Sequence, residues 1–431
     1  MKNKTLPVFV LTLLLVAACV PAGPAGPTGP DLNATATQAA LNHAATQTAA
    51  VFIATATASQ TLEPLPVPSD TATPTVFQPT PSNTQFLAYI SNGHLLVTDV
   101  TNNVQGGTTQ YTVAGQSDQV TDLAWSPSGE FVAFVSAATG EPHLFYIFAL
   151  GQSSPTDLGP GSAPAWSPDS GSIAYVRGTS PDDNIWVTTI DTPAPRQLTF
   201  ESNYAWGRPV YTPDGNSLIV AGADRNNMGA QGNTSFTLQS LALDGSGGRA
   251  TLPGAMPLDG VRLPQDLRFS PDGQHLAFST SYHWNACAAP GAYYVSDPIG
   301  GNRQELISPS LKLFVDPNTE HFHVGLSYAW SAFSDGVVAL GNVIDCNLNS
   351  PTAGQVIAGP QISILRMDGT EGYVIPGFFY GISMDRTGTL IAAAHFEGGF
   401  QDLNPSLEIY SAQTGQLVLP LEPGSNPQFQ P

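Results

Sequence analysis

The chain has 431 residues, of which 42 are glycine and 38 are proline, and only 11% are charged. This composition favours many short strands joined by tight turns over long helices. Its 33 acidic residues outnumber its 13 lysines and arginines and give a formal net charge of −20. Such a surface repels phosphate, which excludes a nucleic-acid-binding protein. It also repels anionic lipid headgroups, so membrane attachment requires something other than a basic patch.

The N-terminal residues have the pattern of an export signal. Two lysines precede an apolar stretch from Leu6 to Ala18, which is shorter than the roughly 20 residues that span a bilayer. The stretch ends in Val-Ala-Ala-Cys at positions 16–19. This motif resembles the lipobox of bacterial lipoproteins, in which the cysteine is lipidated and becomes the first mature residue. We expect residues 1–18 to be a signal peptide and Cys19 to anchor the protein on the extracytoplasmic side of a bacterial membrane. An ordinary cleaved signal peptide is the alternative.

Residues 19–85 differ in composition from the rest of the chain. Both ends of this segment are rich in proline, and its middle repeats alanine, threonine and glutamine. Proline-rich segments favour extended conformations, and this composition cannot build a core. We expect a tether between the lipid and a folded domain over residues 86–431.

A repeated unit runs through the folded domain. Each copy has an aromatic or apolar strand, a turn of the Ser-Pro-Asp-Gly type and a second, alternating strand, followed by a third and a fourth strand. Proline presets φ for such a turn, and aspartate and glycine suit the positions after it. Copies begin at Asp122, Ala163, Arg208 and Asp266, with weaker ones at Tyr328 and Gly381. Four short strands repeated every 40 to 60 residues or so indicate the blades of a β-propeller.

The repeats resemble the WD-like repeats of the TolB-type propeller family, whose hallmark is a Trp-Ser-Pro-Asp-Gly turn before an Ile-Ala-Phe/Tyr strand. The resemblance covers residues 86–431. It is close at Trp125, Trp166, Tyr211 and Phe269 and weak at Trp330 and Met384. It implies a bacterial, extracytoplasmic propeller that serves mainly as a binding platform. It does not fix a ligand, because propellers host many unrelated functions.

The two ends of the domain are expected to complete one blade. Residues 86–115 contain a second, third and fourth strand without a first, and residues 424–431 resemble a first strand alone. Joining them closes the ring and removes exposed sheet edges. Together with the six units, this predicts an all-β propeller of seven four-stranded blades, or of six or eight if a long unit is misread.

Blade topology also predicts where a ligand binds. The first-to-second and third-to-fourth turns share one face, the turn face, whereas the second-to-third loops and the connections between blades share the other, the loop face. Long loops are expected on the loop face at 224–235, 281–292, 342–361 and 395–405, and loops on rigid scaffolds carry function. The candidate ligand-binding residues there are His283, Trp284, His321, His323, Asp345, His395 and Glu397. The alternative is that they are scattered surface residues.

Cys287 and Cys346 fall in loops of neighbouring blades. With Cys19 lipidated, they are the remaining thiols in an oxidising compartment, so we expect a disulfide between them. The alternative is a metal site that adds His283 or His321, but no C-x-x-C or H-x-x-x-H spacing supports it. We predict no metal and no cofactor.

The sequence favours a binding module over an enzyme. It has no G-x-S-x-G nucleophile elbow, no hydrolase domain beside the propeller and no full set of sialidase boxes. We assign no catalytic residue. The main hypothesis is that a protein or another envelope component binds to the loop face. The alternative is a propeller that binds or hydrolyses a carbohydrate or peptide in the central channel.

Overall fold

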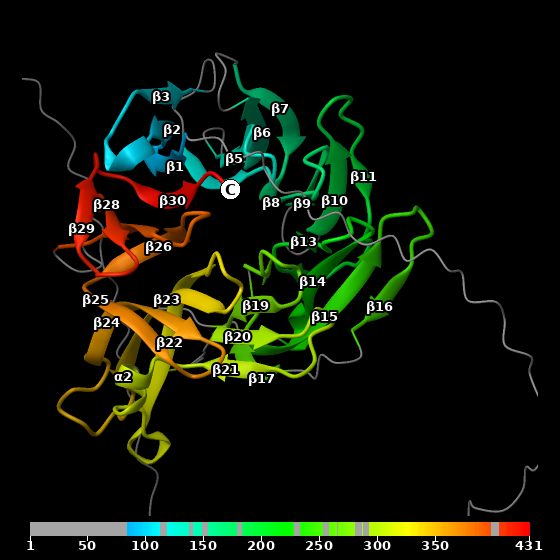
Figure 1. Ribbon diagram of the computed structural model, residues 1–431. Coiled ribbons are helices and arrows are strands. Elements are labelled where there is room, and N and C mark those ends of the chain that lie inside the picture. The colour runs from blue at the N-terminus through cyan, green and yellow to red at the C-terminus, as the bar shows by residue number, and fades with distance from the viewer. Residues whose placement is uncertain are drawn as a thin grey trace, which may run out of the picture. The chain divides into compact units, whose positions relative to one another are not determined.

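The computed structural model describes residues 84–112, 119–137, 141–148, 154–178, 183–227, 233–252, 258–264, 266–280, 287, 293–397 and 405–431. Their strands form seven sheets arranged in a ring (Figure 1). This confirms the prediction of an all-β, seven-bladed propeller. Within these ranges, helix is confined to short segments, and none is long and apolar enough to cross a membrane.

In each sheet the inner strand lies nearest the centre of the ring, and the others follow outward. Five sheets keep chain order. They are β4 (Val120–Trp125), β5 (Phe131–Ser136), β6 (His143–Phe148) and β7 (Thr156–Pro160); β8 (Ser162–Trp166), β9 (Ser172–Arg177), β10 (Asn184–Thr189) and β11 (Arg196–Gln197); β18 (Arg268–Phe269), β19 (Leu276–Ser279), β20 (Tyr293–Ser296) and β21 (Gln304–Leu306); β22 (His321–Trp330), β23 (Gly336–Asp345), β24 (Val356–Arg366) and β25 (Glu371–Pro376); and β26 (Phe379–Met384), β27 (Leu390–His395), β28 (Ser406–Ser411) and β29 (Leu417–Pro420).

One sheet departs from the four-strand pattern. Its strands are β12 (Tyr204–Trp206), β13 (Val210–Tyr211), β14 (Ser217–Asp224), β15 (Asn233–Ala242), β16 (Arg249–Thr251) and β17 (Leu258–Arg262). The inner strand is split, because β12 and β13 both pair with β14, and the unpredicted β17 pairs with β15. At the split, a Cβ on Gly207 would lie 2.1 Å from the carbonyl oxygen of Pro264, so only glycine fits there.

The remaining sheet joins the two ends of the domain. The inner strand β30 (Ser425–Phe429) pairs antiparallel with β1 (Phe86–Ser91), and β2 (His94–Asp99) and β3 (Thr108–Tyr111) follow outward. Figure 1 shows this sheet as red beside blue. The predicted closure of the ring is therefore confirmed.

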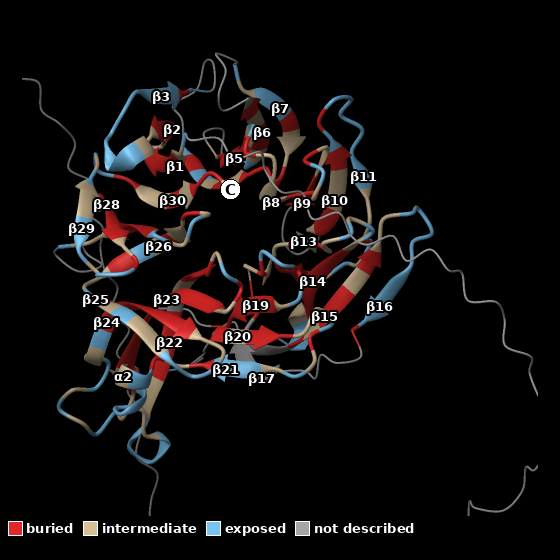
Figure 2. Cartoon of the chain, in the orientation of Figure 1, coloured by how far each residue is buried: buried red, intermediate tan, exposed pale blue. Residues whose placement is uncertain are grey.

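The core lies between neighbouring blades. The strands are buried along most of their length, and the exposed residues gather on outer strands and loops (Figure 2). One buried cluster combines Leu95 and Val97 of β2 with Leu123 of β4 and Phe134 of β5. Each blade therefore covers an apolar face of the next.

The tryptophans of the repeat link neighbouring blades. The indole N–H of Trp166 donates to the carbonyl of Ala124 on the preceding inner strand at 2.9 Å. Trp125 and Trp330 make the same contact, at the same distance, with Gln428 and Arg268. Because the indole is large and has a donor at its edge, it fills the space between blades and also satisfies a backbone carbonyl.

The aspartates of the repeat build turns. In the blade of β8, the hydroxyl of Ser167 donates to Asp169 at 2.5 Å and accepts from the N–H of Ser172 at 2.9 Å. The hydroxyl of Ser167 also lowers the pKa of Asp169. The pairs Thr212–Asp214 and Ser270–Asp272 repeat the arrangement. The Ser/Thr-Pro-Asp-Gly motif is thus explained by turn chemistry.

Candidate functional site

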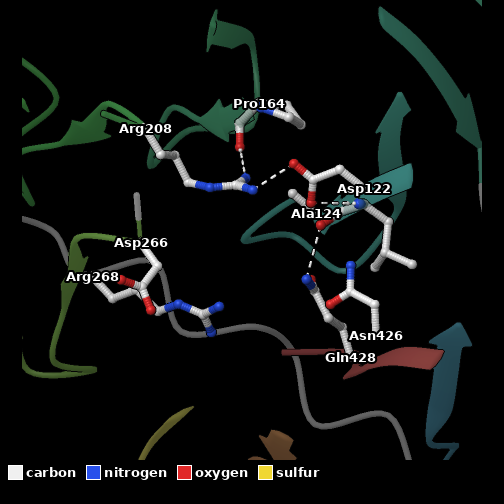
Figure 3. A pocket seen from close by; sticks show the side chains of 9 residues that line it. Asp122, Ala124, Pro164, Arg208, Asp266, Arg268, Asn426 and Gln428 are labelled. Atoms are coloured by element: carbon white, nitrogen blue, oxygen red, sulfur yellow. Dashed lines mark hydrogen bonds and ion pairs between the residues drawn. The ribbon is translucent and has the colours of Figure 1, made fainter. Parts of the chain in front are cut away.

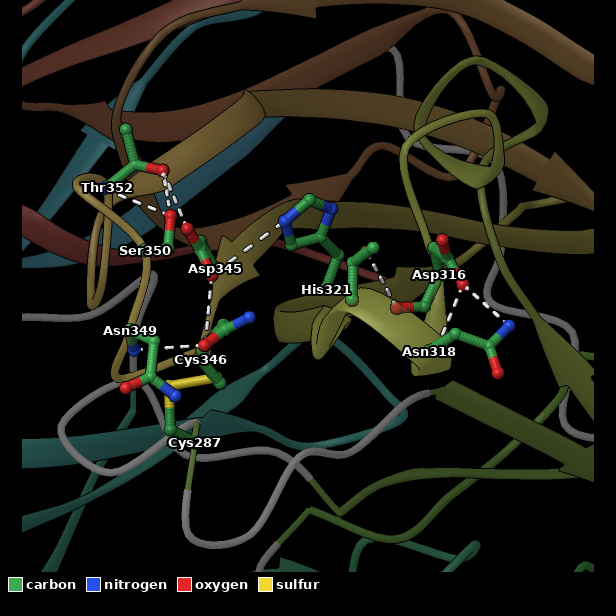
Figure 4. A network of polar contacts seen from close by, with 11 residues as sticks. Cys287, Asp316, Asn318, His321, Asp345, Cys346, Asn349, Ser350 and Thr352 are labelled. Atoms are coloured by element: carbon green, nitrogen blue, oxygen red, sulfur yellow. Dashed lines mark hydrogen bonds and ion pairs between the residues drawn. A yellow bond between two sulfur atoms is a disulfide. The ribbon is translucent and has the colours of Figure 1, made fainter.

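The candidate residues of the loop face that the structure describes do not converge on one site. His321 and Asp345 lie opposite each other on β22 and β23, with Nε2 3.8 Å from Oδ1. Asp345 is buried, and its carboxylate accepts from the hydroxyl of Thr352 at 2.6 Å and from the N–H of Asn347 at 2.9 Å (Figure 4). The Ser350 hydroxyl, followed by that of Thr352, lowers the pKa of Asp345. The carboxylate orders the turn after β23.

His323 lies two residues beyond His321 on the same strand, but in the core. It is 6% exposed, and neither of its ring nitrogens has a hydrogen-bond partner in the described part of the chain. It packs edge-to-face on Tyr293 at 6.2 Å, and a Cβ on Gly341 would come within 2.8 Å of its Nε2. Desolvation lowers the pKa of His323 to about 4, so the ring is neutral near pH 7.

The other candidates belong to different blades. His395, at the end of β27, stacks on Phe379 at 4.8 Å, and its Nδ1 lies 3.1 Å from Oε2 of Glu408. Glu397 is exposed. His283 and Trp284 lie outside the described residues. Within the described ranges, no three His, Cys, Asp or Glu side chains are grouped as a metal site would need.

Half of the segment predicted as a long loop at 342–361 is strand, so the predicted bounds of that loop are wrong. β23 continues to Asp345 and β24 begins at Val356, which leaves only 346–355 as a connection. The cause is pairing: the extended part of β23 is bonded on one side to β22 and on the other to β24. The extension itself contains Val343 and Ile344, β-branched residues that favour a strand.

These long strands form a projection from the loop face, which we call the arm (residues 309–324 and 342–358). It also contains α2 (Pro309–Lys312) and the 3-10 turn η4 (Pro317–Thr319). Figure 1 shows the orange β23–β24 connection and the segment after α2 extending from the same edge of the ring. The N–H of Cys346 donates to the carbonyl of Glu320 at 2.9 Å and holds the two segments together.

A disulfide connects the arm to the neighbouring blade. Cys346 bonds to Cys287, with the two Cα atoms 5.3 Å apart (Figure 4). The arm carries large apolar side chains in solvent: Leu348 is 91% exposed, Leu313 84% and Phe314 49%. Exposed apolar side chains gathered on one projection are typical of a contact surface.

A second feature lies at the centre of the ring. A cavity of about 200 Å³, the channel pocket, opens between the inner strands of five blades. Figure 3 shows polar side chains from several blades facing this space. It is lined by Asp122, Leu123, Ala124, Pro164, Arg208, Asp266, Arg268, Asn426 and Gln428. None of these was a candidate from the sequence.

The charged groups of the channel pocket differ in how they are satisfied. Arg208 forms an ion pair with Asp122 at 2.5 Å and donates to the carbonyl of Pro164 at 2.7 Å. Arg268 lies over the ring of Tyr328, 5.6 Å from its centroid. Burial raises the pKa of Asp266, and the nearby charge of Arg268 offsets only part of the shift.

A signal for this pocket was present in the repeats. We align the seven inner strands on the residue that is aromatic in six of them and Met384 in the other. The position three residues before it is occupied by Asp122, Ala163, Arg208, Asp266, Ser327, Gly381 or Asn426. Four of these seven residues line the pocket, and three of the four are charged. A charged side chain on an inner strand is costly unless it has a partner, so its recurrence at one position indicates a polar centre.

Comparison with solved structures identifies proteins of the same fold. No family model matches the chain. An oligogalacturonate lyase in complex with manganese has a TM-score of 0.50 and 13% identity over 78% of this chain and 83% of its own. An oligogalacturonate lyase from Vibrio parahaemolyticus has 0.50 and 12% over 78% and 85%. The shared feature is the propeller. TolB from Acinetobacter baumannii has 0.45 and 16% over 81% and 67%. At these identities the likeness is one of fold and not of ligand.

Proposed function

We propose that this chain is a lipid-anchored, extracytoplasmic binding module that holds a protein of the cell envelope on the arm of its propeller. The arm is the observation that carries the proposal. Strands β22, β23 and β24 have 10, 10 and 11 residues, whereas β26, β27 and β28 of the next blade have 6 each. Closing the ring does not need this extra length, so another role must account for it.

The arm has the properties of a preformed contact surface. The disulfide, the Asp345 turn and the contact between Cys346 and Glu320 fix its backbone, so little ordering is needed when a partner binds. Its tip exposes Leu348 and its base exposes Leu313. Rigid backbone with exposed apolar side chains supports recognition of a protein surface.

The remainder of the proposal concerns location. The lipobox-like motif ending at Cys19 and the Pro-rich segment behind it support a protein that is tethered by lipid. A lipid with more than one acyl chain holds a protein on a membrane stably, whatever its surface charge. A tethered propeller is confined near its membrane, which raises its effective concentration for envelope partners.

Affinity capture from cross-linked membranes tests the proposal. The full-length protein is compared with a Leu313→Asp/Leu348→Asp variant. Leu417→Asp is the matched control, because Leu417 is also an exposed leucine but begins β29 on the turn face. We expect a partner held by the wild type and the control to be reduced at least about tenfold with the arm variant. Equal capture by all three proteins would exclude the arm as the binding surface.

A further inference from the structure

We propose that the channel pocket is a separate site that binds a small ligand through a carboxylate group, with Arg268 as the anchor. This inference goes beyond the proposed function. The pocket is built from inner strands and the arm from residues 309–324 and 342–358, so either site can fail without the other.

The size of the pocket limits the ligand. About 200 Å³ is the volume of roughly seven waters at about 30 Å³ each. That space suits a group of the size of one amino-acid residue or one sugar ring. Its lining combines apolar residues with polar side chains from separate blades that face the same space (Figure 3). Convergent polar groups in a concave site favour a ligand with defined orientation.

Arg268 is the group that lacks a partner. Only ten arginines occur in the sequence, and two of them line this pocket. Arg208 is paired with Asp122, but the guanidinium of Arg268 makes no ion pair within 4.0 Å and no hydrogen bond to any described residue. Tyr328 covers its face, which leaves the N–H groups at its edge available to a ligand.

The neighbouring carboxylate does not cancel this charge. Asp266 also lines the pocket and interacts electrostatically with Arg268, but the two side chains form no ion pair within 4.0 Å, and burial raises the pKa of Asp266. Arg268 is therefore left with an incompletely compensated positive charge. Arg268 is half-buried, and a partly desolvated charge of this kind is stabilised when a ligand supplies the missing anion.

Two amides complete the site. Nε2 of Gln428 donates to the carbonyl of Leu123 at 2.8 Å, which fixes the side chain and leaves its oxygen as an acceptor. The amide of Asn426 makes no hydrogen bond to the described residues, and its backbone is left-handed with φ 48°. Amides beside a guanidinium suit a carboxylate that also carries amide or hydroxyl groups.

A carboxylate fits better than other ions. A cation would meet only Asp122, which is already paired, and Asp266, whose protonation is favoured by burial. A phosphate dianion would meet a single unpaired arginine in a protein of net charge −20. A planar carboxylate matches the two parallel donors at the edge of one guanidinium.

Two kinds of compound supply a carboxylate of this size: a peptide, through its C-terminal end, and an acidic sugar. Isothermal titration of the detergent-solubilised full chain uses trialanine and glucuronate as probes. Trialanine amide and glucose are the matched neutral compounds, and inorganic phosphate is the competing anion. Arg268→Gln removes the charge, and Arg268→Lys keeps the charge without the paired donors. Arg303→Gln removes an arginine that is not part of the pocket.

We expect one carboxylate probe to bind the wild type and Arg303→Gln alike, its neutral counterpart not to bind, and Arg268→Gln to weaken affinity about 10- to 100-fold. The probe that binds identifies the source. If Arg268→Gln does not fold, Arg268→Lys provides the test, with a loss of several-fold. Binding of no probe tighter than about 10 mM, equal binding by the Arg268 variants, or preferential binding of phosphate would each overturn the proposal. Loss of partner binding at the arm alone would not affect the proposal for the channel pocket.

Discussion

The indole nitrogen of Trp166 lies 2.9 Å from the carbonyl oxygen of Ala124 in the preceding blade, and the two form a hydrogen bond. The indole of Trp206 is also buried, but its nitrogen has no partner among the described residues. Trp166→Phe removes the donor of this part-buried hydrogen bond, so we expect the free energy of unfolding to fall by about 0.5 to 1.5 kcal/mol beyond the cost of the lost volume. Trp206→Phe removes an unsatisfied donor and carries only the cost of the lost volume, so it is expected to destabilise the fold less than Trp166→Phe. Urea titration measures both.

The contrast between these two variants is the decisive result. Both replace a buried indole by a smaller ring, so a general cost of lost volume would affect them equally. Equal destabilisation would show that the hydrogen bond between blades contributes nothing measurable.

The neutral, buried imidazole of His323 predicts weakening of the fold at mildly acidic pH. The pKa of His323 is about 4 in the folded protein, against an ordinary value of 6.5. Between these values the unfolded chain binds the proton more readily, so the free energy of unfolding falls as pH is lowered from 6.5 toward 4. This one group accounts for a loss of up to about 3 kcal/mol.

His323→Leu should remove this pH dependence, because leucine does not titrate. The measurement is the change in urea midpoint between about pH 7 and about pH 4.5 for the wild type and the variant. A change of the same size in both proteins would contradict the assignment to His323.

The disulfide predicts a redox-sensitive stability. Cys287 and Cys346 are 59 residues apart, and in the chain-entropy model a loop of this length stabilises the fold by about 4 kcal/mol. We expect Cys287→Ser/Cys346→Ser to lower the free energy of unfolding by about this amount. Reductant should destabilise the wild type to the level of the variant and leave the variant unchanged. A reductant effect on the variant would point to another thiol.

Lipidation predicts a change in partitioning. Cys19→Ser removes the acceptor thiol, so the variant should lose incorporation of a labelled fatty acid and move from the detergent-rich to the aqueous phase on detergent phase separation. Burial of each acyl CH₂ contributes about 0.8 kcal/mol, so the shift should be nearly complete. A wild type that already remains in the aqueous phase would favour an ordinary cleaved signal peptide.

The blade count and the closure of the ring could be predicted because the same strand and turn motif recurs along the chain, and the strand order then follows. The pairing of β1 with β30 could be predicted for the same reason. The arm could not be predicted, because residues 336–345 read equally well as a short strand with a loop and as one long strand. Pairing on both sides decided the outcome, and it depends on partners elsewhere in the chain.

The candidate site shows a different limit. His321 and His323 share a strand, but one meets Asp345 and the other lies in the core. Alternation gives the side of a strand on which a residue lies, but not what covers that side. Arg268 carries no signal in the repeat, whose recurring residues are those of the turn. Its role arises from the convergence of five inner strands, which no single repeat contains.

The blade shared by the two ends of the domain also determines when folding can finish. The hydroxyl of Ser91 donates to the carbonyl of Pro423, 332 positions later. At a synthesis rate of about 5 to 20 residues per second, β1 exists for roughly 20 to 60 seconds before its inner neighbour has been made. During that interval the edge of β1 is unpaired and available to another chain. Completion of this blade therefore waits for β30, and the growing polypeptide must be kept from premature association until that strand has been made.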